Sequence, residues 1–149
     1  MKSLDKTDHK ILNILQEDCM LPVKEIAERV GLSFTPTYER IRNLKNSEVI
    51  ARYVAILDAE KSGFEIMAYC NITLKEQSQE KLREFEAQIT AEANVLEVVS
   101  LSGIYDYMIK VVAKNIKEYN RFMTDVIANI PNIGQYHSQI VLSVAKDIT

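Results

Sequence analysis

The 149-residue sequence has little of three things on which many protein functions depend: cysteine, glycine and long apolar runs. Its two cysteines, Cys19 and Cys70, lack the paired spacing of a zinc site, and we expect free thiols in a reducing compartment. Four glycines leave no Gly-x-Gly-x-x-Gly or Walker-type loop for a nucleotide phosphate. No apolar run approaches the roughly 18 residues of a membrane span, and the start of the chain lacks a signal peptide's apolar core. We therefore expect a cytoplasmic protein with no membrane partner and no cofactor.

The two histidines give little support for catalysis or metal binding. Neither His9 nor His137 has the cysteine or aspartate spacing around it that a metal site or a catalytic triad would need. We expect both to be structural, and we expect no catalytic residues, no metal ligands and no enzyme activity.

The charge is mixed, and it is unevenly distributed along the chain. Eighteen basic and 21 acidic side chains give a net charge of −3, which argues mildly against a nucleic-acid-binding protein. However, residues 1–52 hold 9 basic and 8 acidic side chains, whereas residues 53–149 hold 9 and 13. The positive charge is therefore concentrated where phosphate contacts would be needed if the N-terminal part bound DNA.

Residues 22–45 predict two short helices joined by a tight turn. Apolar side chains recur with a helical period in both halves, at Val23, Ile26, Ala27 and Val30, and then at Phe34, Thr37, Tyr38, Ile41 and Leu44. Gly31 suits the left-handed conformation that ends a helix, and the Ser33 hydroxyl can cap the next helix. With another amphipathic helix over residues 4–17, this predicts a three-helix, helix-turn-helix head whose last helix fits the major groove of DNA.

We expect the last helix of this head to contact both base edges and phosphates, because it offers short hydroxyls and longer cationic donors. The candidate DNA-binding residues are Ser33, Phe34, Thr35, Thr37, Tyr38, Arg40, Arg42 and Asn43. Three of them, Phe34, Thr37 and Tyr38, also belong to the stripe that we expect to pack against the rest of the head. The alternative is a solvated helix face on which Arg40 forms an ion pair with an acidic neighbour.

After residue 66 the apolar pattern alternates between the periods of strands and helices. Strands are expected at 68–74, 95–101, 107–113 and 136–144, and helices at 78–91 and 116–130. This βαββαβ order predicts a ferredoxin-like domain, in which both helices cover one face of a four-stranded antiparallel sheet. A partner subunit usually covers the other face. The candidates for that open face are Tyr69, Thr73, Tyr107, Ile109 and Val111.

Together these patterns predict an α+β protein with two domains. A helix-turn-helix DNA-binding domain is expected at 1–50 and a ferredoxin-like domain with an open sheet face for oligomerisation at 66–149. Between them, residues 51–65 are expected to form a linking strand, over 52–57, and a connector.

Several short motifs occur in an order that is typical of one family. They are Leu-Asp-Lys-Thr-Asp-His-Lys-Ile-Leu at 4–12, Glu-Ile-Ala at 25–27, Val-Gly-Leu-Ser at 30–33, Glu-Arg-Ile at 39–41, Val-Ile at 49–50, Ser-Gly-Ile-Tyr-Asp-Tyr at 102–107 and Ile-Pro-Asn-Ile at 130–133. Over nearly its whole length the chain thus resembles the Lrp/AsnC family of bacterial and archaeal regulators. It departs from the family pattern at Phe34, where Pro is common, and at Ser47-Glu48 and Asn132, where Gly is usual.

The resemblance implies that the second domain binds a small effector, often an amino acid, at subunit contacts, and that the chain forms dimers and often octamers. The turn at 102–106 is the candidate site: Gly103 permits accessible backbone donors for a carboxylate, and Asp106 could accept a bond from an ammonium group. The alternative is an ordinary turn in which Asp106 accepts bonds from backbone donors. The candidate effector-binding residues are Gly103, Ile104, Tyr105, Asp106, Ser138 and Gln139.

We therefore expect a sequence-specific DNA-binding transcription regulator that responds to a small effector, with an amino acid as the leading candidate. Its expected partners are double-stranded DNA, the effector and copies of itself. Two alternatives stay open: a cofactor-free enzyme on a dimeric ferredoxin-like domain, with only Asp106 and His137 as catalytic groups, and an architectural protein that wraps DNA without sensing an effector. Salt-dependent, sequence-selective DNA binding would exclude the first alternative, and an effector-dependent change in that binding would exclude the second.

Overall fold

The computed structural model describes residues 3–146, which form two compact units. The first unit ends at Ile56, and the second runs from Leu57 to Lys146. The division between them lies inside the stretch 51–65 that the sequence predicts as a linking strand and connector. The predicted outer limits of the domains, residues 1 and 149, lie outside the described residues.

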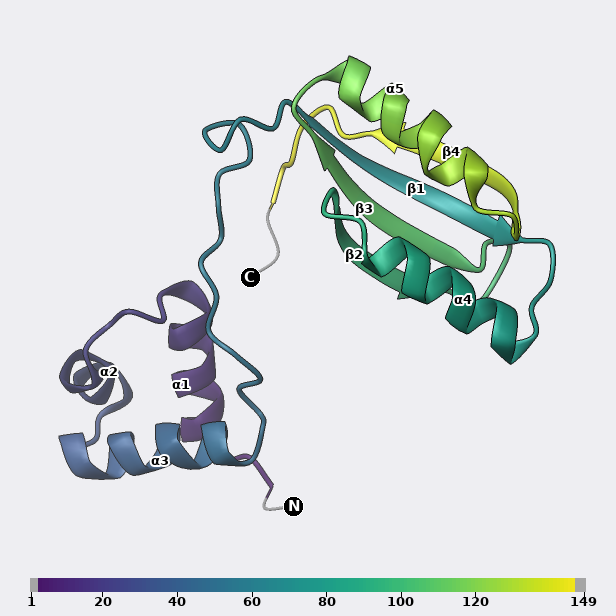
Figure 1. Cartoon of the computed structure of the whole chain (residues 1–149). Helices are drawn as coiled ribbons and strands as arrows, with labels where there is room; N and C mark the ends of the chain where they lie inside the picture. The colour runs from purple at the N-terminus through teal and green to yellow at the C-terminus, as the bar shows by residue number, and fades with distance from the viewer. Residues whose placement is uncertain (1–2, 147–149) are drawn as a thin grey trace. The chain divides into compact units, whose positions relative to one another are not determined.

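The first unit is the three-helix head that the sequence predicts. Its helices are α1 (Lys6–Glu17), α2 (Val23–Val30) and α3 (Phe34–Asn46) (Figure 1). Each helix contributes one fully buried apolar side chain to a common core, and these are Ile11, Ile26 and Leu44. Because each stripe of apolar side chains must be buried against another element, three short helices form one small core together.

The turn between α2 and α3 follows the sequence signals closely. Gly31 ends α2 with φ of 72°, and the N–H of Leu32 donates to the carbonyl of Ala27 at 2.9 Å, as in a left-handed helix end. Ser33 is the N-cap of α3, but its hydroxyl makes no capping hydrogen bond. The capping role expected for that hydroxyl is therefore wrong, and the hydroxyl is exposed on the surface.

The packed face of α3 is narrower than the sequence suggests. Thr37 and Leu44 are buried and Ile41 packs beside them, whereas the side chains of Phe34 and Tyr38 are exposed. The expectation that these two aromatic side chains pack inside the head is therefore wrong. At 100° per residue they lie at the edge of the apolar stripe, and a head of three short helices is too small to cover that edge.

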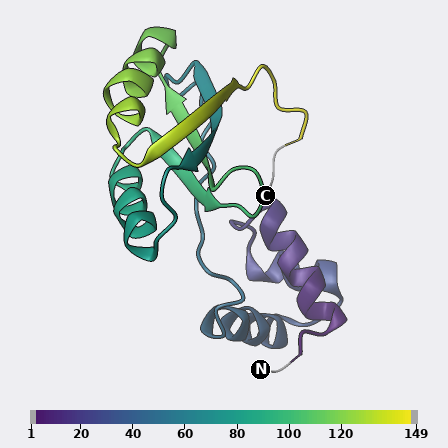
Figure 2. The same cartoon turned by 90° about the vertical axis from the view of Figure 1, so that its right-hand side faces the viewer.

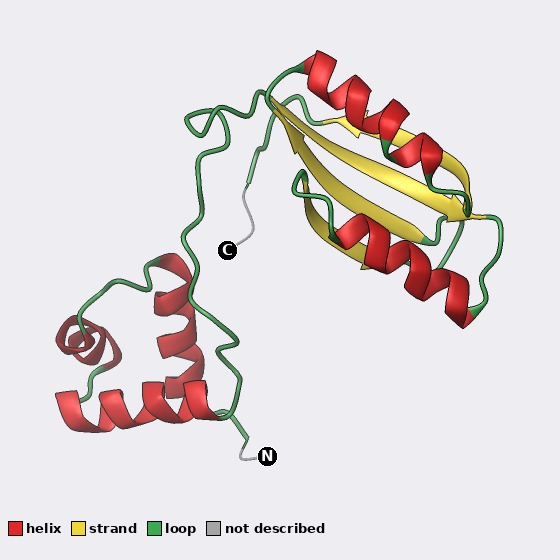
Figure 3. Ribbon diagram, viewed as in Figure 1, coloured by secondary structure: helices red, strands yellow, loops and turns green. Residues whose placement is uncertain are grey.

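The strand expected at 52–57 is absent, because residues 51–57 are in neither a helix nor a strand (Figure 3). The apolar side chains of Val54, Ile56 and Leu57 in this segment are exposed. A strand is defined by hydrogen bonds to a neighbouring strand, and no strand in the described part of the chain pairs with this segment. The run of apolar residues at 53–57 alone was not sufficient for a strand here.

The second unit is the ferredoxin-like βαββαβ domain, as predicted. Its elements are β1 (Ile66–Leu74), α4 (Gln79–Thr90), β2 (Val95–Ser100), β3 (Tyr107–Ala113), α5 (Ile116–Asp125), the short 3-10 helix η1 (Ile127–Asn129) and β4 (Ile133–Ile140). The strands pair antiparallel in the order β2-β3-β1-β4. Strand β4 begins and ends earlier than the predicted 136–144, and α5 stops short of the predicted residue 130.

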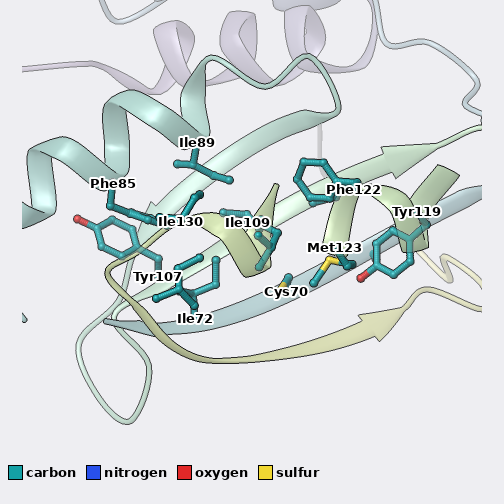
Figure 4. Close-up of a cluster of buried hydrophobic side chains, with 14 of the residues drawn as sticks. Cys70, Ile72, Phe85, Ile89, Tyr107, Ile109, Tyr119, Phe122, Met123 and Ile130 are labelled. Carbon is teal, nitrogen blue, oxygen red and sulfur yellow. The ribbon is translucent and has the colours of Figure 1, made fainter. Parts of the chain in front are cut away.

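Both helices of this domain cover the same face of the sheet (Figure 2). On β1 the buried side chains alternate, and they are Ala68, Cys70, Ile72 and Leu74. Aromatic side chains from both helices complete this core, including Phe85 of α4 and Phe122 of α5 (Figure 4).

The register of the sheet decides which side chains remain on the uncovered face. Cys70 is opposite Ile109, and Ile72 is opposite Tyr107, so the side chains of Tyr107, Ile109 and Val111 point into the core. The expectation that these three lie on the open face is wrong, whereas Tyr69 and Thr73 do alternate with the buried positions. The open sheet face, as we call it below, consists of Glu97 and Val99 of β2, Tyr69, Asn71 and Thr73 of β1, Met108 and Lys110 of β3, and Gln135, His137 and Gln139 of β4.

Candidate DNA-binding and effector sites

The solvent side of α3 brings together most of the candidate DNA-binding residues. The exposed ones are Ser33, Phe34, Thr35, Tyr38, Arg42 and Asn43. Four of them, Ser33, Phe34, Thr35 and Tyr38, lie at or near the N-terminal end of α3, which is the part of a recognition helix that reaches base edges in the major groove, whereas Arg42 and Asn43 lie in its C-terminal half. Hydroxyl, aromatic, amide and guanidinium groups are thus all exposed along α3.

Thr37 differs from these residues because it is completely buried. Its hydroxyl donates a hydrogen bond to the backbone carbonyl of Ser33 at 3.0 Å, one helical turn earlier. With no exposed surface and its hydroxyl already bonded, Thr37 has nothing to offer a base or a phosphate. Its candidacy as a DNA-binding residue is therefore corrected to a packing role.

The side chain of Arg40 is also bonded to other residues of the head. Its guanidinium donates to the carboxylate of Asp5 at 2.7 Å and to that of Asp8 at 2.6 Å. These two carboxylates already form the capping box at the start of α1, in which each bonds the other residue's backbone N–H. Bonds from the backbone N–H of Asp8 and then from Arg40 hold the pKa of the Asp5 carboxyl below its usual value. The ion pair considered as the alternative for Arg40 is present, and it attaches α3 to the start of α1.

Arg42 and Lys45 are the remaining cations of α3. Arg42 pairs with Glu39 one turn away, but both side chains are exposed, so the pair contributes little and can exchange for a phosphate. The Nζ atom of Lys45 lies 5.3 Å from the ring centroid of Tyr53, within cation–π distance, and Lys45 is an exposed residue. These two side chains are the cations of α3 that a phosphate can reach.

In the second unit, Asp106 anchors the turn that the sequence identifies as a candidate effector site. One carboxylate oxygen accepts from the backbone N–H of Leu74 at 2.7 Å, and the other accepts from the Nε2 amide of Gln77 at 2.7 Å. Its own backbone N–H donates to the carbonyl of Ile72 at 2.9 Å. Asp106 therefore fastens the turn to the end of β1, which is the alternative that the sequence left open for this residue.

The turn itself leaves its backbone donors open. Among the described residues, no acceptor bonds the N–H groups of Ser102, Gly103, Ile104 or Tyr105. Gly103 has φ of 143°, a conformation that favours glycine, and the Ile104 side chain is 87% exposed. A turn with several free N–H groups is suited to binding a carboxylate.

The two candidates on β4 do not share a site. Neighbouring side chains in a strand point to opposite faces of the sheet. The hydroxyl of Ser138 faces the helices and lies 3.8 Å from the sulfur of Met123, whereas Gln139 is opposite Tyr69 and belongs to the open sheet face. One pocket wall cannot use both side chains.

Two residues that are not among the candidate effector-binding residues lie next to the turn. The ring of His137 is 5.6 Å from the ring of Tyr105, and Gln77 bonds Asp106. Both contacts join residues about thirty positions apart, so no local spacing could have indicated them. The Asp-Tyr motif was the only sequence signal near this place.

Neither a metal site nor a membrane span emerges from the described residues. Within residues 3–146, no three histidine, cysteine or acidic side chains come together in a way that could hold a metal ion. No helix in that range is both long enough and apolar enough to cross a bilayer.

A helix-turn-helix head joined to a ferredoxin-like domain defines a class of two-domain transcription regulators. Residues 4–45 match the model of the AsnC-type helix-turn-helix domain, and residues 67–149 match that of the Lrp/AsnC ligand binding domain. The chain belongs to the Lrp/AsnC family of transcriptional regulators, as the motifs indicate.

Relatives of known structure or function agree with this assignment. The HTH-type transcriptional regulator FL11 of Pyrococcus horikoshii is 36% identical over 98% of this chain and 94% of its own length. An AsnC family transcriptional regulator of Agrobacterium tumefaciens is 35% identical, with a TM-score of 0.90 over 98% of this chain and 95% of that one. A transcriptional regulator of Neisseria meningitidis, solved as a complex with L-Met, is 28% identical, with a TM-score of 0.93 over 99% and 95%. These relatives are regulators of transcription and not enzymes.

Proposed function

We propose that this regulator binds selected duplex DNA through the exposed side of α3, and that an amino acid held by its second domain changes that binding. The observation that carries the proposal is the surface of α3. The Ser33 and Thr35 hydroxyls, the Asn43 amide and the exposed cations Arg42 and Lys45 can be reached by DNA. The buried Thr37 and the ion-paired Arg40 hold the helix in place. A rigid helix with this surface is what base recognition in the major groove requires.

Within the proposed interface, the exposed residues divide by chemistry. Ser33, Thr35 and Asn43 offer hydrogen bonds to base edges, and Arg42 with Lys45 offers charge to phosphates. Arg40 would not contact DNA itself but would act indirectly, because its bonds to Asp5 and Asp8 set the position of α3 in the head. Sequence preference would then come from the first group and salt dependence from the second.

The proposed effector is an amino acid, bound at the turn 102–105. The free N–H groups of this turn supply donors for a carboxylate, and the Neisseria relative was solved with L-Met. Because both Asp106 oxygens are bonded within the chain, Asp106 would shape the turn rather than hold the ammonium group alone. The Tyr105 ring of this turn and the His137 ring, whose centroids are 5.6 Å apart, would complete the site.

We also propose that two copies pair through the open sheet face, since an uncovered sheet with half-buried Tyr69 and Asn71 is typical of a subunit contact. Larger assemblies up to an octamer rest on the family resemblance alone. A regulator of this kind would work in the cytoplasm, where it meets the DNA.

The proposal is tested with the full-length protein in two steps. Selection from a random duplex library should yield a preferred sequence, bound with a steep salt dependence. A thermal-shift screen of the twenty amino acids should then find a ligand that raises the melting temperature, and that ligand should change the affinity for the selected duplex. No sequence preference would contradict the DNA-binding part, and a ligand with no effect on DNA affinity would contradict the regulatory part.

A further inference from the structure

Two aromatic side chains form an exposed pair at the start of α3. The rings of Phe34 and Tyr38 are stacked, with centroids 6.1 Å apart and an interplanar angle of 10°. Phe34 is 54% exposed and Tyr38 is 47% exposed. They are four residues apart on one helix, so they lie one above the other on the same side of it.

An exposed pair of aromatic rings is unusual on the surface of a protein. A single exposed apolar side chain is ordinary, but two stacked aromatic rings form a contiguous apolar surface that is typical of a binding site. The two rings pack against each other, and an aromatic side chain has few rotatable bonds. Little side-chain conformational entropy is therefore lost when a ligand covers this surface.

The charges around the pair indicate what covers it. Arg42 lies one turn beyond Tyr38 and Lys45 two turns beyond it, so cations continue the side of α3 that the rings begin. The acidic residue on this helix, Glu39, is already paired with Arg42. The cations are complementary to a polyanion. The apolar surface, at the start of a recognition helix, is complementary to an apolar group that this polyanion presents in a groove.

The major groove of DNA presents one such group. The C5 methyl of thymine is the apolar feature of its edge, and phenylalanine is among the side chains that contact it, whereas the other groups there are hydrogen-bond donors and acceptors. We propose that the Phe34–Tyr38 pair binds thymine methyl groups and makes this chain selective for thymine at one or two positions of each half-site.

The inference rests on the proposed placement of α3 in the major groove and adds the chemistry that two of its side chains recognise. Ser33 and Thr35 beside the pair keep their roles at neighbouring base edges. In this arrangement the Tyr38 ring supports the Phe34 ring, and both rings lose their contact with water when the methyl is bound.

Uracil tests the proposal because it pairs with adenine as thymine does and lacks only the methyl. A preferred duplex is first selected with the full-length protein, and each of its thymines is then replaced in turn by uracil. We expect one or two replacements per half-site to weaken binding about fourfold for each methyl lost, and replacement elsewhere to have no effect.

Variants of the protein connect that loss to the rings. Phe34→Ala should bind the thymine duplex more weakly and should no longer distinguish thymine from uracil at the sensitive positions, a coupling that a double-mutant cycle measures. Phe34→Leu and Tyr38→Phe keep an apolar surface and should keep the distinction. Met20→Ala is the matched control, because Met20 is an exposed apolar residue of the same head outside α3.

Three results would overturn the inference. If the protein binds a selected duplex equally well when uracil replaces thymine at any position, the rings do not contact a methyl group. The proposal that α3 binds DNA would survive that result. If only 5-methylcytosine in place of cytosine changes the affinity, thymine is the wrong source of the methyl. If the protein selects no duplex at all, the proposed function and this inference fail together.

Discussion

Arg40 and Asp8 are joined across the head, with the guanidinium of α3 donating to the carboxylate of α1 at 2.6 Å. The two residues are 32 positions apart in the chain. Because the same guanidinium also bonds Asp5, the cap of α1 and the middle of α3 form one connected network. The arginine that the sequence offers as a phosphate contact thus positions the recognition helix.

Arg40 and Arg42 should therefore behave differently when each is replaced by alanine. Arg40→Ala should lower the free energy of unfolding of the head by about 1 kcal/mol, because it removes the partner of Asp8. It should leave the salt dependence of DNA binding unchanged. Arg42→Ala should leave stability unchanged and reduce the slope of log affinity against log salt by about one.

Urea unfolding and DNA titrations at several salt concentrations measure these two quantities. Replacing Arg29, an exposed arginine on α2, by alanine serves as the control for loss of a surface charge. A reduced salt slope in Arg40→Ala, with normal stability, would show that Arg40 contacts phosphate after all.

The dependence of unfolding stability on pH, below neutral pH, should reflect the bonds between Arg40, Asp5 and Asp8. The pKa of the Asp5 carboxyl is lowered in the folded head, so its contribution is present above the unfolded pKa of about 4 and is lost as the pH falls through the lower, folded value. The difference in urea midpoint between the native sequence and Arg40→Ala should accordingly be complete at pH 6 and should shrink below about pH 4. A difference that stays constant down to pH 2.5 would mean that the carboxylates do not matter.

Two buried tyrosines should respond in opposite ways to loss of their hydroxyl groups. The hydroxyl of Tyr107 donates to Glu86 at 2.7 Å, whereas the buried hydroxyl of Tyr119 has no hydrogen-bond partner among the described residues. Figure 4 shows both rings within the core. Tyr107→Phe should cost about 1 kcal/mol, and Tyr119→Phe should be neutral or stabilising, since it removes a hydroxyl that is buried without a bond.

Alkaline titration separates the two further. Burial and the bond to Glu86 raise the pKa of Tyr107 to about 12. Its contribution to stability should be complete below the unfolded pKa of about 10 and be lost as the pH rises towards 12. Tyr107→Phe should abolish this loss of stability between about pH 10 and pH 12. If the variant and the native protein lose stability alike in this range, the raised pKa of Tyr107 is not its cause.

Asp106 should prove to be a structural anchor. Asp106→Ala leaves the backbone N–H of Leu74 without its acceptor and should lower the free energy of unfolding by about 1–3 kcal/mol. Gln77→Ala removes the exposed bond alone and is the matched control, with an expected change below about 0.5 kcal/mol. Thermal unfolding of both variants, with and without the amino acid found by the screen, is the measurement. A normal melting temperature with lost ligand binding would instead make Asp106 a direct ligand contact.

A charge in the middle of the open sheet face should prevent pairing of subunits. Asn71 lies on this face between Met108 of β3 and His137 of β4. Asn71→Lys should shift the protein towards monomers in sedimentation velocity at micromolar concentration, because like charges would meet or be buried at the contact. Gln88→Lys on the exposed side of α4 carries the same charge change and should assemble normally. A native chain that sediments as a monomer would contradict the proposed contact.

The sequence by itself determined the order of the elements and the place of each turn in the head. These features depend on interactions within a few residues: the helical stripes of α1 and α2, the left-handed Gly31 that ends α2, and the alternation of buried side chains along β1. Local periodicity and backbone preference were sufficient for them, because the same physics acts in any context. The family resemblance carried the assignment further, from fold to the class of regulator.

Only the tertiary structure decided which polar side chains remain free for a ligand. Arg40 bonds a residue 32 positions away, and Asp106 bonds Leu74, also 32 positions away. The register of β1 against β3 then placed Tyr107 in the core, where an alternation read from one strand allowed either face. Such contacts join distant parts of the chain, and a pattern with a period of two or four residues contains no information about them.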